Sequence, residues 1–456
     1  MTRTIAEQLA AFTELLDGEA LPEDVRRMAR WCLLDWFGSA VAGAKAKPTA
    51  ILLDVARGLG GTPEATLLPD GSRTSAPLAA LVNAGASHVV EMDDLHKQAV
   101  FHPGATVIPA ALAVAEREGA SGTELLAAIV AGYEVGIRLG EAAGQRHYDF
   151  WHTTGTCGTF AAAAAAGKLL GLDTRHLAAA FGSAGTVAAG LWEFLVDGAM
   201  SKQLHPAKAA HDGILCALLA ERGFTAATRI LEGEKGFLRA MAQGGDAARL
   251  TEGLGSGTFR ILATSFKAHA ACYHIHSSID AALLLRERHR PDPQSIRSVT
   301  VRLYGAAYRL LQPVQPTSPY AAKFSVPYCV ATALLHGAVG PDAFTEARLA
   351  EEAVRALLAK VRLAHDPTLD GAYPEQWPAV VELETTAATN SVRVDIPRGD
   401  PAHPTSEVDL LTKFNTLTAA LPPEDRRRLA ETCLAMEKIE NVAAALEGLK
   451  FSAPRL

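Results

Sequence analysis

The stretch EMDDLHKQAVFHPG, residues 91–104, concentrates groups that can exchange protons or bind anions. It holds three carboxylates, two histidines and a lysine, and an apolar run with helical spacing follows its final Pro-Gly turn. Backbone N–H groups at a helix start attract anions, and a histidine there can exchange protons near neutral pH. The pattern favours acid–base chemistry on a carboxylate. The alternative is that Asp93 or Asp94 only caps a helix and His102 is a hydrogen-bonded loop residue.

A second dense group of ionisable side chains lies in TSFKAHAACYHIHSSID, residues 264–280. Lys267 and three histidines lead into a helical pattern, and a lysine near a helix start would form a second anion site. His276 and Asp280 are four residues apart and share a helix face, so the carboxylate could orient or charge the imidazole. The alternative is that these histidines are structural.

Further candidate residues come just before or within three other helical patterns. MSKQLHPAKAAH supplies Lys202 and His205 at a helix start, where a solvated surface is the alternative. HYDFWHTTGTCGTF supplies His152 together with several hydroxyl groups. AAKFSVPYCVATALLHG supplies Tyr328, which is a proton donor if its hydroxyl reaches a cleft and a core residue otherwise.

Several standard functional motifs are missing from the sequence. It has no P-loop, no HExxH and no GxSxG, which removes the best support for nucleotide, zinc-protease and serine-hydrolase functions. Asp93, Asp94, His96 and His102 are a possible metal-binding set, but they match no recognised ligand spacing. A metal site is therefore a weaker alternative than an anion site.

Composition limits the class of protein. At 456 residues, with 49% hydrophobic and 20% charged residues, the chain should form a globular enzyme with two domains. A net charge of -7 without a Lys/Arg block opposes nucleic-acid binding. The six scattered cysteines fit a reducing compartment. We see no signal peptide and no apolar run of about 18 residues, so we expect a cytoplasmic protein without a membrane span.

Hydrophobic periodicity divides the chain into two kinds of region. Residues 5–222 repeat at helical spacing, and Ser121 with Glu124 forms the capping-box pattern at one helix start. After about residue 267, period-two alternation appears in RSVTVRLYG, VVELET and SVRVDIP, and the last stretch is helical again. We expect a mainly α protein in which a large all-helical domain from both chain ends surrounds a smaller inserted α+β domain. The predicted boundaries are 1–266 with 398–456, and 267–397.

Six stretches, taken in order, resemble one protein family. They are LLDWFGSAVAGA, HVVEMDDLHKQAVFHPGATVIPAALAVAE, FWHTTGTCGTFAAAAAAGKLLGLD, SKQLHPAKAAHDG, KFSVPYCVATALLHG and GDPAHPTSEVDLLTKF. The set resembles the MmgE/PrpD family, which includes 2-methylcitrate dehydratases, cis-aconitate decarboxylases and iminodisuccinate epimerases. The resemblance implies the two-domain arrangement above, a homodimer and an active site between the domains. It also implies no organic cofactor and no obligatory metal.

The resemblance also assigns site residues by position. The family's acidic pair, HP histidine, TK lysine, KPYP-like lysine and SxxY tyrosine fall on Asp93 and Asp94, His102, Lys202, Lys267 and Tyr328. The chain departs from the family pattern at Leu95, where Thr is common, and at Cys272, where animal-type decarboxylases carry a histidine. These departures make decarboxylation of cis-aconitate less favoured than other chemistry of the family.

We therefore predict an enzyme that removes a proton next to a carboxylate of a small polycarboxylate. In this hypothesis His102 is base or acid, Asp93 orients a histidine or is the partner base, and Tyr328 donates a proton. Lys267 and Lys202 anchor carboxylates. The other substrate-binding residues are Asp94, His152, His276 and Glu91. A hydro-lyase resembling 2-methylcitrate dehydratases ranks first, an epimerase of an iminodisuccinate-like dicarboxylate second, and a non-catalytic polycarboxylate-binding protein third.

Overall fold

The protein is mainly α-helical, as the sequence predicted. The computed structural model describes residues 3–311, 315–449 and 451. Helices account for 59% of the structure and strands for only 8%. The described chain divides into two compact units, which we call the helical unit and the mixed unit. The helical unit comprises the described residues of Met1–Val89, Asp93–Thr264 and Ser406–Leu456, and the mixed unit comprises those of Val90–Met92 and Ser265–Thr405.

This division differs in detail from the predicted domain boundaries. It places the return to the helical unit at Ser406 rather than near residue 398. It also assigns Val90–Met92 to the mixed unit, and these include the first two residues of the stretch 91–104, which we call the acidic stretch. The outermost residues of the predicted helical domain, 1 and 456, lie outside the described residues. No helix in the described ranges is long and apolar enough to cross a membrane.

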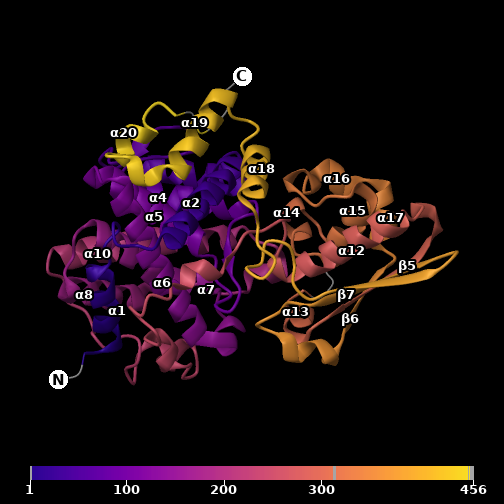
Figure 1. Cartoon of the computed structure of the whole chain (residues 1–456), viewed down its shortest axis with the longest axis horizontal. Helices are drawn as coiled ribbons and strands as arrows, with labels where there is room; N and C mark the ends of the chain where they lie inside the picture. The colour runs from indigo at the N-terminus through magenta and orange to yellow at the C-terminus, as the bar shows by residue number, and fades with distance from the viewer. Residues whose placement is uncertain (1–2, 312–314, 450, 452–456) are drawn as a thin grey trace. The chain divides into compact units, whose positions relative to one another are not determined.

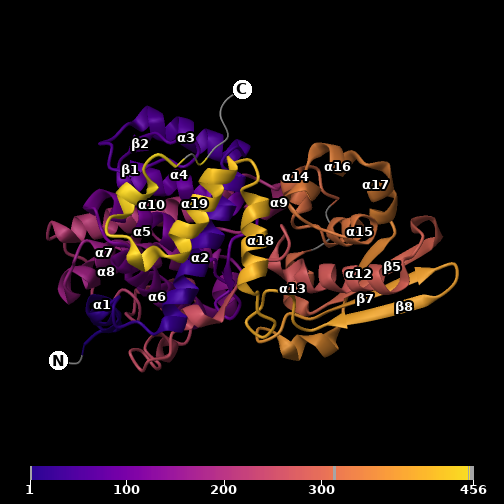
Figure 2. The ribbon, with the colours of Figure 1, turned by 45° about the horizontal axis from the view of Figure 1, so that its top comes forward.

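The helical unit contains helices from both ends of the chain. From the N-terminal part they are α1 (Ile5–Leu15), α2 (Glu23–Gly43), α3 (Lys47–Leu59), α4 (Ala76–Val89), α5 (Pro103–Glu118), α6 (Gly122–Tyr148), α7 (Thr153–Leu169), α8 (Thr174–Val187), α9 (Phe194–Asp197), α10 (Ser201–Glu221) and α11 (Phe237–Met241). The C-terminal part adds α18 (Glu407–Leu417), α19 (Pro423–Leu434) and α20 (Val442–Leu446), and α18 and α19 pack against α2 (Figures 1 and 2). Short strands of this unit are β1 (Ala65–Thr66), β2 (Arg73–Thr74) and β3 (Leu95–His96), and β4 (Thr264–Ser265) lies at the boundary of the two units in the sequence.

Close helix packing at the centre of this unit follows from its small residues. The Ala-rich helix α7 contacts α5, α6 and α10, and all of its residues from Ala161 to Ala166 are completely buried. A Cβ atom added at Gly213 of α10 would lie 2.5 Å from the Cβ of Ala162 and 2.7 Å from the backbone nitrogen of Ala163. The two backbones therefore approach closely only because Gly and Ala occupy the contact. The predicted capping box of Ser121 is also present, at the start of α6.

The mixed unit combines one sheet with several helices. Its helices are α12 (His276–His289), α13 (Gly305–Leu310), α14 (Pro319–Ala322), α15 (Val326–His336), α16 (Glu346–Ala350) and α17 (Glu352–Leu358), and its strands are β5 (Ile296–Leu303), β6 (Val361–His365), β7 (Ala379–Thr385) and β8 (Thr389–Val394). The strand order is β6-β5-β7-β8, with β5 and β6 parallel and the other neighbours antiparallel. Helix α12 contacts β7, β8 and α15 (Figure 1). The alternating segments predicted as strands became β5, β7 and β8, whereas β6 was not predicted.

Candidate active site

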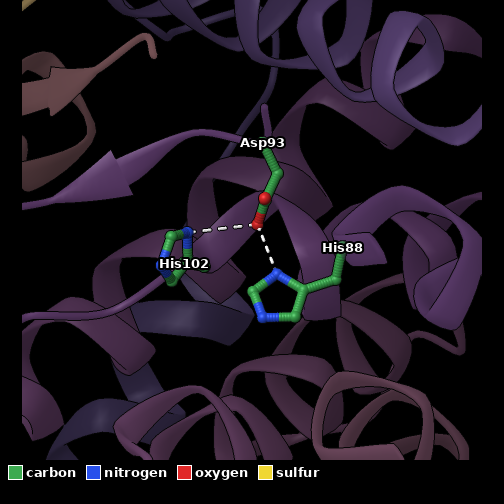
Figure 3. Close-up of side chains that lie close together, drawn as sticks. All are labelled: His88, Asp93 and His102. Carbon is green, nitrogen blue, oxygen red and sulfur yellow. Dashed lines mark hydrogen bonds and ion pairs between the residues drawn. The ribbon is translucent and has the colours of Figure 1, made fainter. Parts of the chain in front are cut away.

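Asp93 joins two histidines in the helical unit. His88 lies in the last turn of α4, Asp93 follows five residues later, and His102 is the N-cap residue of α5. The Asp93 Oδ2 atom is 2.7 Å from His88 Nδ1 and 3.1 Å from His102 Nδ1. All three side chains are at least nine-tenths buried. Figure 3 shows both imidazoles turned toward the same carboxylate oxygen.

The hydrogen bonds of His102 determine which ring nitrogen can act as a base. Its Nδ1 atom is 2.8 Å from the carbonyl oxygen of Asp94, in addition to its contact with the Asp93 carboxylate. Both neighbours accept hydrogen bonds, so Nδ1 carries the proton and donates it. In the neutral ring Nε2 then carries the lone pair. Nε2 of His102 is therefore the ring nitrogen that can accept a proton, and the Asp93 carboxylate beside Nδ1 favours the charged form of the ring.

Asp94 has a different, structural set of contacts. Its Oδ1 atom accepts a 2.9 Å hydrogen bond from the backbone N–H of Gly104, in the first turn of α5, and its Oδ2 atom accepts one from the Tyr133 hydroxyl. Burial raises the pKa of Asp94 to about 7, although these hydrogen bonds act in the opposite direction. A Cβ atom at Gly104 would lie 2.7 Å from Oδ1, so only glycine leaves room for this contact. Asp94 therefore caps the start of α5, as the alternative in the sequence analysis stated. Its contact with a substrate stays a prediction.

Two further histidines extend the cluster. His152 immediately precedes α7, His205 lies in the first turns of α10, and their Nδ1 atoms are 3.0 Å apart. The ring centroid of His152 is 5.7 Å from that of His88 and 6.4 Å from that of His102. Because two facing nitrogens need one donor and one acceptor, His152 and His205 present complementary tautomers.

Burial and nearby positive charge keep His152 and His205 neutral. Burial, followed by the proximity of His205 and of the Lys202 ammonium group, lowers the pKa of His152 well below its usual value. Burial, with His88, Lys202 and Lys208 nearby, lowers the pKa of His205 to about 4. The buried Lys202 therefore supplies positive charge beside neutral imidazoles, an environment that suits a carboxylate ligand.

The structure thus brings together four of the predicted residues: Asp93, His102, His152 and Lys202. Sequence reasoning missed His88, which lies in the quoted stretch HVVEMDD but at the end of an apolar helix, where a histidine is commonly a core residue. It also missed Trp192, whose ring centroid is 4.9 Å from that of His152. No local signal marked Trp192.

Glu91 and Lys267 form an ion pair within the mixed unit. The Glu91 Oε2 and Lys267 Nζ atoms are 2.9 Å apart, and their side chains are 1% and 0% exposed. Nearby, Lys323 donates hydrogen bonds to the backbone carbonyls of Val90 and Ala270. Both residues of the pair were predicted for the site, but their pairing was not. A lysine neutralised in this way is a weaker anion anchor than the sequence suggested, because an incoming carboxylate competes with Glu91.

Asp280 orients a different histidine from the one predicted. Its Oδ1 atom is 3.0 Å from His269 Nε2 and accepts a 2.8 Å hydrogen bond from Arg398 Nε. Burial opposes its ionisation, but His269 and Arg398 hold the pKa of Asp280 well below the usual range. His276 instead has its Nε2 atom 3.3 Å from the carbonyl oxygen of Ala271. Asp280 thus makes its hydrogen bonds with His269 and Arg398, and it acts on His276 through its charge, which raises the pKa of that imidazole against the larger effect of burial.

Tyr328 lies in the core of the mixed unit. Its side chain is completely buried on α15, and its hydroxyl donates a hydrogen bond to the backbone carbonyl of Ala343. Burial raises the pKa of Tyr328 to about 12. The core alternative therefore accounts for the contacts of Tyr328, and its role as a proton donor stays a prediction.

The residues that could bind a metal in the structure differ from the predicted set. Possible ligand atoms lie within 4.8 Å of one another in His88, Asp93 and His102. His96 is not in this group, and its Nε2 atom is 3.9 Å from Glu141 Oε1. Tetrahedral ligands about 2.0–2.1 Å from zinc are separated by roughly 3.3 Å. The 2.7 Å contact between His88 Nδ1 and Asp93 Oδ2 is shorter and fits a hydrogen bond. The described geometry is therefore that of a hydrogen-bonded network.

Comparison with known proteins identifies the family. The MmgE/PrpD N-terminal domain model matches residues 7–250, and the MmgE/PrpD C-terminal domain model matches residues 269–437. Cis-aconitate decarboxylase of Aspergillus terreus (strain NIH 2624 / FGSC A1156) is 26% identical, over 97% of this chain and 95% of the relative. The Homo sapiens cis-aconitate decarboxylase is 27% identical, over 100% of this chain and 96% of the relative. The first domain model alone covers more than half of the sequence, and the chain therefore belongs to the MmgE/PrpD family.

Proposed function

We propose that this protein is a lyase that moves a proton at the carbon next to a carboxylate of a small polycarboxylate. The observation that carries the proposal is the geometry of His102, whose Nδ1 atom donates to the Asp94 carbonyl and faces the Asp93 carboxylate. This arrangement leaves Nε2 as the base. The relatives named above are cis-aconitate decarboxylases, whose name describes a lyase reaction on a small polycarboxylate.

In the proposed mechanism, Nε2 of His102 takes the proton and the ring becomes an imidazolium. Asp93 stabilises that charge through the hydrogen bond at Nδ1, and it also keeps the ring oriented. Lys202 stabilises the negative charge that develops on the substrate carboxylate as the proton leaves. The neutral pair of His152 and His205 offers one ring N–H donor and one ring nitrogen acceptor for hydrogen bonds to the substrate.

The finer activity that we place first is dehydration of a substrate related to 2-methylcitrate. Loss of a hydroxyl group needs a proton donor, and the imidazolium that His102 forms in the first step can return its proton to the leaving oxygen. Decarboxylation of cis-aconitate is the second candidate, and the names of the relatives favour it. Epimerisation of an iminodisuccinate-like dicarboxylate and non-catalytic binding are the remaining alternatives. A homodimer stays an expectation from the family resemblance, and a cytoplasmic location stays one from the composition of the sequence. Sedimentation of the purified chain tests the homodimer.

Proton NMR in D2O tests the proposal and separates these alternatives. The full chain is incubated with citrate-like, aconitate-like and aspartate-derived polycarboxylates, and deuterium exchange and products are followed. Exchange with loss of water identifies a dehydratase, loss of carbon dioxide a decarboxylase, and exchange with inversion alone an epimerase. Binding by calorimetry without exchange would identify a binding protein and contradict the proposal. The His102→Asn variant is the matched control, because it removes Nε2 and retains a donor near the Nδ1 position.

A further inference from the structure

We propose that His88 is a positioning residue for His102 and acts on it through Asp93. The two imidazoles share one carboxylate oxygen, so His88 limits how strongly Asp93 draws the Nδ1 proton of His102. This inference rests on the proposed function, because it concerns the same base. It assigns a role to a buried histidine that the mechanism above does not use.

The distances show that His88 is the closer partner of the carboxylate. Its Nδ1 atom is 2.7 Å from Asp93 Oδ2, whereas His102 Nδ1 is 3.1 Å from the same atom. His88 is 0% exposed and its ring centroid is 5.0 Å from that of His102, in an edge-on arrangement (Figure 3). Its backbone lies in the last turn of α4, so the ring is held in place by a helix rather than by a loop. An ionised carboxylate only accepts, so Nδ1 of His88 donates.

Sharing an acceptor has a predictable effect on the base. An oxygen that accepts two hydrogen bonds is a weaker acceptor for each of them than an oxygen that accepts one. Without His88, the Asp93 carboxylate would turn fully to His102 and stabilise its imidazolium form more strongly. A larger fraction of His102 would then be protonated at neutral pH and unable to act as a base. His88 thus holds Asp93 in a position that orients His102 without over-stabilising its charged form.

Other groups that face His102 come from three elements. His152 and Thr154 lie at the start of α7, and the Thr154 hydroxyl accepts a hydrogen bond from the backbone N–H of His102. Lys202 and His205 belong to α10 and contribute positive charge and a neutral ring. The remaining group is the carbonyl of Asp94, which also accepts from Nδ1 of His102. Replacing His88 leaves the Thr154 hydroxyl and the Asp94 carbonyl in place, but it also removes a group that lowers the pKa of His152 and of His205. A change in the pH profile therefore reports the shared carboxylate only where variants with and without the donor to Asp93 differ.

Three substitutions separate the hydrogen bond from the mere presence of a side chain. His88→Asn places an amide N–H near the position of Nδ1 and retains the donor. His88→Gln places its amide near the position of Nε2 and removes the donor from Asp93. His88→Leu fills similar space with no donor at all. If the leucine variant does not fold, the comparison of Asn with Gln carries the same test.

The first readout is the pH profile of proton exchange on whichever panel compound the wild type converts. For His88→Gln and His88→Leu we expect the low-pH limb to move up by about one pH unit, the ordinary scale of a changed hydrogen-bond environment. On the low-pH side of the wild-type limb turnover should fall by about tenfold, it should recover at higher pH, and His88→Asn should stay near the wild type. A uniform loss of rate at every pH, or equal behaviour of Asn and Gln, would overturn the inference.

The second readout needs no substrate. A hydrogen-bonded Nδ1 proton gives a downfield proton NMR signal, and the signal of His102 can be assigned because it changes in His102→Asn. We expect this signal to move further downfield in His88→Gln and to stay in place in His88→Asn. If no panel compound reacts, the proposed function fails, yet this signal still tests the shared carboxylate. A signal that is unchanged in all three His88 variants would refute the coupling itself.

Discussion

Replacement of His102 by asparagine should abolish most turnover while leaving the fold intact. The asparagine amide N–H can donate to the carbonyl oxygen of Asp94 and to Asp93, as Nδ1 of the imidazole does at 2.8 and 3.1 Å. The variant lacks only the basic Nε2 atom. Asparagine is also a favourable N-cap residue, and position 102 is the N-cap of α5.

The expected magnitudes follow from these contacts. Loss of one acid–base group lowers turnover by about 100-fold to 10,000-fold, or about 2.7–5.4 kcal/mol at 1.36 kcal/mol per factor of ten. Because the hydrogen bonds at Nδ1 are retained, the free energy of unfolding should change by less than about 1 kcal/mol. His102→Ala leaves the Asp93 carboxylate and the Asp94 carbonyl without this donor. Its unfolding free energy should therefore fall by about 1–3 kcal/mol.

Two measurements on the same preparations check this reasoning. Deuterium incorporation at saturating substrate gives the turnover, and urea unfolding gives the stability. We expect both variants to be nearly inactive and only the alanine variant to be destabilised. More than about a tenth of wild-type turnover in His102→Asn would remove this residue from the proton transfer. Equal destabilisation of both variants would refute the assignment of the proton to Nδ1.

Three further predictions concern the acidic stretch. Asp93→Asn removes the charge that stabilises the imidazolium, so turnover should fall by about 100-fold or more while substrate binding, measured by calorimetry, stays close to wild type. Lys267→Met removes the cation that lies 2.9 Å from the buried Glu91 carboxylate and should lower the free energy of unfolding by about 3–5 kcal/mol, whereas the double variant with Glu91→Gln should recover most of this loss in urea unfolding. The raised pKa of Asp94, about 7, means that the unfolded carboxyl ionises first as pH rises from about 4 to 7, so stability should decline over that range in the wild type and not in Asp94→Asn. Unfolding curves at pH 4.5 and 7.5 check the last prediction.

Local patterns were sufficient to predict most of the secondary structure. The capping box of Ser121 is present at the start of α6, and the alternating segments became β5, β7 and β8. Strand β6 was missed because it has only five residues, occupies one edge of the sheet and follows the helical run of α17 with two residues between. Its alternation is too short to be distinguished from the end of a helix.

The candidate site was predictable only where its members are close in sequence. Asp93 and His102 could be found because they lie in one short stretch before a helix. The partner of Glu91 is 176 residues away, and no spacing rule connects the two. His88 was overlooked for a different reason, since it ends an apolar helix whose other residues form the core. Tertiary packing alone turns that helix end toward the Asp93 carboxylate.

The acidic stretch shows why residue type alone does not determine function. Glu91, Asp93 and Asp94 are all at least 98% buried, and a buried carboxylate must find charged or hydrogen-bonding partners. Glu91 pairs with a lysine, and Asp94 accepts from a helix N-terminus and a tyrosine hydroxyl. Neither set of partners gains or loses a proton readily near neutral pH. Asp93 alone contacts imidazoles, which exchange protons in that range, so among these three carboxylates it is the one whose environment connects burial to proton transfer.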